Sequence, residues 1–239
     1  MTKILRNQVV EEFAAARLAE FEQLLGRALK PPTPIELMAE RLLGLSLLWE
    51  PIEELPGEVI FGGIRPEDRL VVLNENQRKL FEEKPGLVRS TVGHEMGHWD
   101  LFVDQATLDH PMLAGFDRPE SFPKRSTPVG EVVVVSRMMQ SAEGRELLRQ
   151  MESRADDPHE ARAVNRYAAA ISMPPGLIRR DALAIDRTKW PPLYALAKRY
   201  EVTITALRVR LEQLDLLHVD DKGRLFESKD AAIGQGRLF

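Results

Sequence analysis

The sequence predicts an α+β protein that is mostly helical and carries a small antiparallel sheet of three strands. In several long segments apolar residues recur at every third or fourth position, which is the spacing of amphipathic helices. Between the second and third of these segments lie three short runs rich in β-forming residues, separated by Pro, Gly and Asp turns. These runs are LSLLWEPI (45–52), GEVIFGGI (57–64) and RLVVLNE (69–75).

The expected helices are bounded by turn and capping residues. The first is ended by Pro31 and Pro32, and Thr33 with Pro34 is typical of a helix start. A stretch rich in Pro, Gly, Asp and Ser, from 104 to about 129, predicts a long loop of the kind that often covers a site. The run 131–139 fits a buried strand or a helix. The helices are expected at 7–29, 34–43, 85–103, 142–154, 161–172, 193–200 and 204–217.

Composition limits the chemistry and the partners. The chain of 239 residues contains no cysteine, so any bound metal must be held by His, Asp or Glu. Its N-terminal residues do not resemble a secretory signal, and no apolar run is long enough to span a membrane, so we expect a cytoplasmic protein without membrane contact. The net charge of −4 provides no general attraction to nucleic acid.

The stretch GHEMGHW, residues 93–99, carries the clearest chemical signal. Residues four apart on a helix share a face, so His94 and His98 can present ring nitrogens to one metal ion. Glu95 lies about 100° around the helix from His94, where a carboxylate can act as a general base without binding the metal. The alternative is that His94 and His98 face solvent and match this short pattern by chance. Gly93 and Gly97 each weaken the helix by about 1 kcal/mol relative to Ala. Close approach of a neighbouring backbone or of a substrate would offset this cost, and so would simple tight packing.

A catalytic zinc ion needs a third protein ligand. Asp104 stands where one extended zinc-protease motif has its third ligand, but Leu101 replaces the glycine of that motif. His110 and His159 are imidazoles in expected loops. Glu160, at the start of an Ala-rich helix, is the remaining candidate, although a carboxylate there also stabilises the helix dipole.

The GHEMGHW stretch and the later segment DPHEARAVNRYAAAISMP (157–174) together resemble the ImmA/IrrE family of bacterial and phage metallopeptidases. The family segment has the form E-x-x-A-N-x-F-A-x-x-L-L-M-P, and its glutamate completes the zinc site. This chain matches at five positions: Asn165, Tyr167, Ala168, Met173 and Pro174.

Three departures from the family segment bear on the third ligand. Val164 and Ser172 replace Ala and Leu, and Glu160 precedes Asn165 by five residues instead of four. One extra residue rotates a side chain by about 100° on a helix, so Glu160 must lie at the helix start or before a bulge to face the metal. If Glu160 does not face the metal, Asp157 and His159 are the alternative third ligands.

The resemblance, which spans roughly residues 35–218, implies a zincin-like metallopeptidase domain at 1–180 and a helix-turn-helix-like segment at 181–239. It implies an endopeptidase that uses Zn²⁺ held by His94, His98 and Glu160, with Glu95 as general base. Several family members cleave a helix-turn-helix repressor and so derepress stress or mobile-element genes. The alternative is a transcriptional regulator that uses the zincin-like part for binding without cleavage.

Two further roles rest on single residues. Asn165 is expected to orient the Glu160 carboxylate or to be a helix-packing amide, and Tyr167 and His110 are candidates for stabilising an oxyanion. In the C-terminal segment Arg208 and Arg210 suit a DNA-reading helix, although the balanced charge there favours a structural or repressor-docking module over direct DNA binding.

Overall fold

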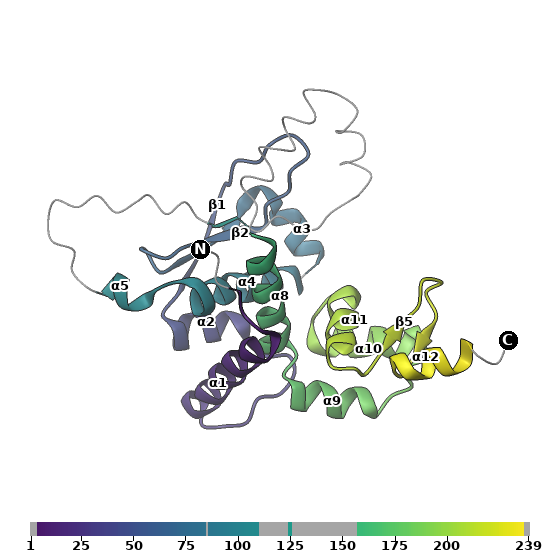
Figure 1. The fold of residues 1–239 in the computed structure, drawn as a ribbon. Helices are drawn as coiled ribbons and strands as arrows, with labels where there is room; N and C mark the ends of the chain where they lie inside the picture. Colours follow the sequence, from purple (N-terminus) through teal and green to yellow (C-terminus); the bar gives the residue numbers. More distant parts are fainter. Residues whose placement is uncertain (1–3, 85, 110–123, 126–156, 237–239) are drawn as a thin grey trace, which may run out of the picture.

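The computed structural model describes residues 4–84, 86–109, 124–125 and 157–236. These residues form an α+β protein in which helices dominate, as the sequence predicts. Figure 1 shows two lobes, and helix α8 (Pro158–Ser172) packs against α1 and α4 in the N-terminal one. The N-terminal lobe contains α1 (Asn7–Leu25), α2 (Ile35–Leu43), β1 (Ser46–Glu50), β2 (Gly62–Arg65), β3 (Leu70–Asn74), the 3₁₀ turn η1 (Glu75–Gln77), α3 (Arg78–Glu83), α4 (Gly86–Phe102), α5 (Gln105–Asp109) and β4 (Lys124–Arg125).

The sheet is mixed, which corrects the prediction of a purely antiparallel sheet. Its strand order is β1-β3-β2-β4, so the third strand in sequence lies at the centre. β1 pairs with β3 in parallel, from Ser46 opposite Leu70 to Glu50 opposite Asn74, whereas β2 is antiparallel to both β3 and β4. The chain between β1 and β2 crosses past the position that β3 fills, and turn residues alone do not reveal such a crossing.

Helix α4 lies at the centre of the N-terminal lobe. It packs against α8 and α2 and also contacts β2 and β3. The buried side chains of α4 join those of α1 and α8 in one hydrophobic cluster, to which Val92, Met96, Trp99 and Tyr167 belong. Ten of the seventeen residues of α4 are buried, which places GHEMGHW inside the protein and not on a solvated face.

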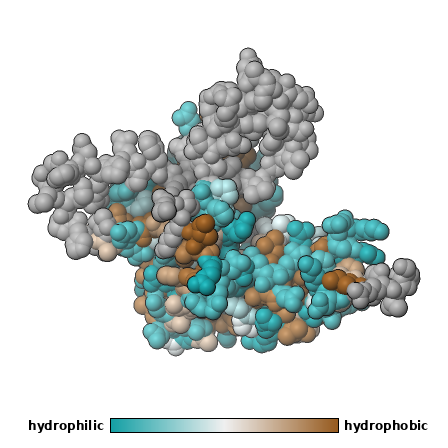
Figure 2. All heavy atoms as spheres, viewed as in Figure 1, coloured by the Kyte–Doolittle hydropathy of each residue, from teal (hydrophilic) through white to brown (hydrophobic). Residues whose placement is uncertain are grey.

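The C-terminal lobe has its own hydrophobic cluster. It contains α9 (Pro175–Leu183), α10 (Trp190–Tyr200), α11 (Ile204–Gln213), β5 (His218–Val219), β6 (Leu225–Phe226) and α12 (Lys229–Gly236). This cluster begins at Met173, and Ile178 and Ala182 of α9 belong to it, so the predicted division after residue 180 falls inside α9. On the face seen in Figure 2 this lobe is mostly hydrophilic.

Several predicted boundaries differ from the observed ones for local reasons. α1 ends at Leu25, because Gly26 adopts the left-handed conformation (φ 64°) that caps a helix. Pro34 is itself the residue before α2, and Thr33 provides no side-chain cap. The predicted loop after residue 104 begins with the short helix α5. The segments expected at 131–139 and 142–154 lie outside the described residues.

None of the helices in the described part of the chain combines the length and the apolar character that crossing a membrane requires.

The two glycines of GHEMGHW face α8. A Cβ atom at Gly97 would lie 3.0 Å from the Cβ and 3.1 Å from the Cα of Val164, whereas one at Gly93 would lie 3.5 Å from the Cβ of Ala168. The first contact is too tight for an unmoved neighbour, and the second is ordinary van der Waals contact. The atoms that crowd Gly97 belong to the backbone and the Cβ of Val164, so close approach of α8 explains this glycine, whereas ordinary packing accounts for Gly93.

We expect Gly97→Ala to be less stable than Gly93→Ala by about 1–3 kcal/mol, because both gain the same helix propensity but only the first overpacks the α4–α8 contact. Urea unfolding of the two variants, with a chelator present to remove metal effects, measures this difference. Equal free energies of unfolding would show that α8 moves away from Gly97 without cost.

Candidate metal centre

The two histidines of α4 point their Nε2 atoms at each other. The Nε2–Nε2 distance is 3.2 Å, and the imidazoles of His94 and His98 are 8% and 1% exposed. Two nitrogens that each bind one tetrahedral zinc ion at about 2.0–2.1 Å are roughly 3.3–3.4 Å apart. The pair therefore fits two adjacent positions around such an ion.

Helix α8 supplies an oxygen atom to the other ring nitrogen of each histidine. Oδ1 of Asn165 lies 3.0 Å from Nδ1 of His94, and Oε1 of Glu160 lies 3.2 Å from Nδ1 of His98. When the Glu160 carboxylate is ionised it only accepts hydrogen bonds, and Nδ1 of His98 is then the donor in this contact. An amide oxygen imposes the same direction on His94.

These contacts determine whether the Nε2 atoms carry a proton or a free lone pair. A neutral imidazole that donates from Nδ1 carries a lone pair on Nε2, so both histidines present acceptors to the same point. Two facing lone pairs at 3.2 Å repel each other unless a cation or a proton lies between them. The electrostatics of the pair therefore favour a shared positive charge.

Glu95, the predicted general base, is completely buried. It directly follows His94 on α4, a helix that contacts α8 and two strands of the sheet. A buried carboxylate next to the proposed metal ligands is shielded from bulk water, which strengthens its electrostatic interactions.

The local fold places Glu160 in the first turn of α8. Asp157 caps this helix, and its side chain accepts hydrogen bonds from the backbone N–H groups of His159 (2.8 Å) and Glu160 (3.3 Å). The five-residue spacing of Glu160 and Asn165 requires Glu160 to lie either at the helix start or before a bulge. In the structure it lies at the helix start. Glu160 is 8% exposed.

The contact of Glu160 is nevertheless with the Nδ1 side of His98, not with the Nε2 pair. Within the part of the chain that the structure describes, no group of three or more His, Asp or Glu side chains has an arrangement that could hold a metal ion. A bound metal would therefore need a third ligand beyond the two imidazoles, and Glu160 reaches the ion only if its side chain turns.

The alternative third ligands do not lie next to the two histidines in the described part of the chain. Asp157 is used as the helix cap, and His159 is exposed. Asp104 is exposed beyond the end of α4. His110 lies outside the described residues.

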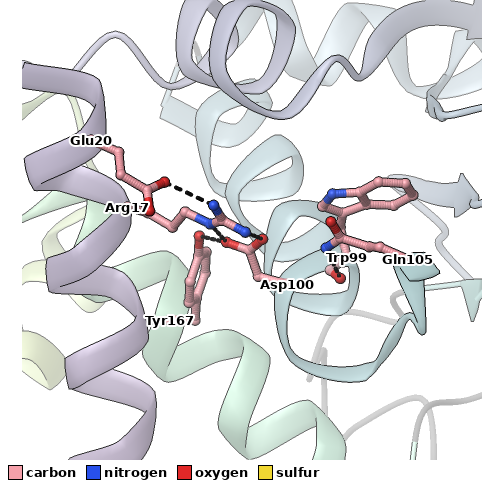
Figure 3. Close-up of polar contacts among 6 residues, drawn as sticks. All are labelled: Arg17, Glu20, Trp99, Asp100, Gln105 and Tyr167. Carbon is pink, nitrogen blue, oxygen red and sulfur yellow. Dashed lines mark hydrogen bonds and ion pairs between the residues drawn. The ribbon is translucent and has the colours of Figure 1, made fainter. Parts of the chain in front are cut away.

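Tyr167 does not have the predicted role of oxyanion stabiliser. Its side chain is completely buried, and its hydroxyl donates a hydrogen bond to Oδ2 of Asp100 (Figure 3). Burial, and then the charge of Asp100, raise the pKa of Tyr167 well above its ordinary value. The hydroxyl is thus engaged inside the protein, away from any substrate.

Asp100 is an important buried carboxylate that the sequence analysis missed. Nε and Nη2 of Arg17 on α1 each donate to one of its oxygens at 2.9 Å, so Asp100 joins α1, α4 and α8 two residues beyond His98 (Figure 3). Next to it, the side chain of Gln105 donates to the backbone oxygen of Trp99 (3.2 Å). Its spacing of seven and three residues from Gly93 and Gly97, which face α8, is the sequence signal that could have indicated its inward position.

The structure corrects one of the two DNA-contact candidates in the C-terminal segment. Arg210 is completely buried, and its guanidinium binds Glu11 of α1 and the backbone oxygen of Met173, so it does not reach a DNA groove. Arg208 is partly exposed, and its Nε lies 3.9 Å from Glu212.

Comparison with known proteins adds little to this geometry. No family model matches the chain, and no curated protein matches it. Among solved structures, a Mycobacterium tuberculosis transcriptional regulator is similar with a TM-score of 0.45 and 14% identity, over 92% of this chain and 59% of the other. The chain thus spans less than two thirds of that protein, and at this TM-score the likeness supports no inference about function.

Proposed function

We propose that the protein is a zinc-dependent endopeptidase whose metal ligands include His94 and His98 and whose general base is Glu95. The observation that carries the proposal is the pair of buried Nε2 atoms, 3.2 Å apart, with an oxygen of α8 next to the Nδ1 atom of each ring. A glutamate directly after the first histidine is the arrangement of an HExxH protease helix. An HExxH pattern matched by chance on a solvated helix face would not place both rings in the interior.

The residues of the chain have separate tasks in this proposal. A bound zinc ion supplies a Lewis acid, which polarises a scissile carbonyl and makes water easier to deprotonate. Glu95 accepts the proton of the attacking water and later delivers it to the leaving amine. His94 and His98 would hold the ion, and their rings are held in place by the Nδ1 contacts with Asn165 and Glu160 of α8.

The substrate class follows from the resemblance of GHEMGHW and the 157–174 segment to the ImmA/IrrE family. We propose that the substrate is a helix-turn-helix repressor, encoded near the gene of this protein, and that its cleavage derepresses stress or mobile-element genes in the cytoplasm. The test is incubation of the zinc-loaded protein with that repressor. Discrete fragments, absent when a chelator is added, are expected. Zinc binding without any cleavage would instead favour a regulator that binds its partner through this domain.

Glu160 is the proposed third ligand. Glu160→Ala and Glu160→Gln are both expected to lower zinc occupancy sharply, because neither side chain offers a carboxylate oxygen. The measurement is zinc per chain after dialysis. His159→Ala is the control, since His159 is the exposed residue directly before Glu160.

The glutamine variant distinguishes two roles for Glu160. Its amide oxygen still accepts the hydrogen bond from Nδ1 of His98 but is a poor zinc ligand. If Glu160→Gln keeps its zinc while Glu160→Ala loses it, Glu160 acts on His98 and is not a ligand.

A further inference from the structure

Asn165 lies at an exposed position of α8, where helix packing does not require an amide side chain. It is exposed on α8, in an Ala-rich stretch, and Asn is a poorer helix former than Ala by several tenths of a kcal/mol. Its amide oxygen nevertheless lies 3.0 Å from Nδ1 of the buried His94. An exposed amide bound to a buried imidazole points to a role toward that ring.

The α4–α8 packing explains how a short side chain reaches the ring. Gly93 faces Ala168 and Gly97 faces Val164, so the two helices run in opposite directions and approach closely at the glycines. Each histidine directly follows one of these glycines, and Asn165 directly follows Val164. The missing side chains at 93 and 97 thus bring α8 close enough for Asn165 to contact His94.

We infer that Asn165 is a positioning residue that holds His94 with its proton on Nδ1 and its Nε2 lone pair directed at the metal. The inference rests on the proposed metal site. It replaces the expectation that Asn165 orients the Glu160 carboxylate, because the amide oxygen contacts the imidazole instead. A hydrogen-bond acceptor behind a metal-binding histidine fixes the ring and raises its basicity, and its loss typically lowers metal affinity by about 10- to 100-fold.

The test compares zinc affinities of the full-length chain by competition with a chromogenic chelator. Asn165→Ala is expected to bind zinc at least about 10-fold more weakly than wild type. Asn165→Asp, which keeps an acceptor oxygen, is expected to bind at least as tightly as wild type. Arg162→Ala, at another exposed position of α8, is the matched control and should bind like wild type.

Two readouts separate this role from a purely structural one. The zinc-free Asn165→Ala protein should unfold within a few degrees of the wild-type temperature, because the better helix propensity of Ala partly offsets the lost hydrogen bond to His94. Nitrogen NMR of the imidazoles should show that the Nδ1-protonated tautomer of His94 loses population in Asn165→Ala and is restored in Asn165→Asp.

The outcomes distinguish this inference from the proposed function. Asn165→Ala that binds zinc as tightly as wild type overturns the role of Asn165, whether or not the protein cleaves a repressor. Weakened binding in Asn165→Ala together with an inactive wild type supports the role of Asn165 and overturns the endopeptidase proposal. A wild-type chain that binds no zinc overturns both.

Discussion

Glu95→Gln is expected to abolish cleavage of the repressor while leaving zinc bound. The glutamine has the same shape and is also polar, but it does not take up the proton of the attacking water. Loss of a general base typically lowers the rate by about 10²- to 10⁴-fold. Since the amide has the same size as the completely buried carboxyl group of Glu95, we expect the packing around it and the fold to persist.

The measurement is the rate of repressor cleavage together with zinc per chain. Glu83→Gln makes the same chemical change at an exposed position of α3 and serves as the control. Zinc retention in Glu95→Gln separates loss of chemistry from loss of the metal. Cleavage by Glu95→Gln at the wild-type rate would exclude Glu95 as the base.

Arg210→Ala is expected to destabilise the protein by about 3–5 kcal/mol, the usual cost of removing one partner of a buried ion pair. Arg210 is completely buried, and two of its guanidinium nitrogens donate to the carboxylate of Glu11 at 2.6 and 2.9 Å. Its Nε also donates to the backbone oxygen of Met173 (3.2 Å), which would lose this donor. The pair links α11 of the C-terminal lobe to α1 of the N-terminal lobe.

Arg208→Ala is the matched control on the same helix. Arg208 is partly exposed and its ion pair with Glu212 is long, so its removal should change the free energy of unfolding by less than about 0.5 kcal/mol. Urea unfolding of both variants measures the difference. Equal stability of the two variants would show that the Glu11–Arg210 pair does not hold the lobes together.

The pH dependence of stability provides a second readout of this pair. Burial alone would raise the pKa of Glu11, but hydrogen bonds and charge from Arg210, and then from Arg166, lower it below 4.5. A lowered pKa in the folded state contributes stability that is present above about pH 4.5 and is lost as the pH falls through the folded value. In Arg210→Ala this acid-dependent loss should become smaller.

Much of the fold could be predicted because its elements follow local rules. The helix around His94, the helix after Asp157 and the three strands were placed by apolar spacing and turn residues, all within a few positions. The parallel pairing of β1 with β3 could not, because it depends on where β2 lies in space. Likewise, the burial of Arg210 depends on Glu11, which is 199 residues away.

In the candidate site too, the features set by local helix geometry could be predicted, whereas those set by contacts between helices could not. Helical geometry was enough to place His94 and His98 on one face, and it required Glu160 to lie in the first turn of its helix. It did not reveal that Glu160 and Asn165 contact the Nδ1 atoms of the two histidines, because this depends on how closely α8 approaches Gly97. Nor did it reveal that Asp100 binds Tyr167 and removes that hydroxyl from catalysis.

The most direct test of the account is the zinc content of the wild-type chain, measured by native mass spectrometry after loading with zinc and exhaustive dialysis. The account predicts one zinc ion per chain, because two buried imidazoles direct their Nε2 lone pairs at one point. A chain that retains no zinc would contradict it and would leave GHEMGHW as a helix that carries two buried histidines without a metal.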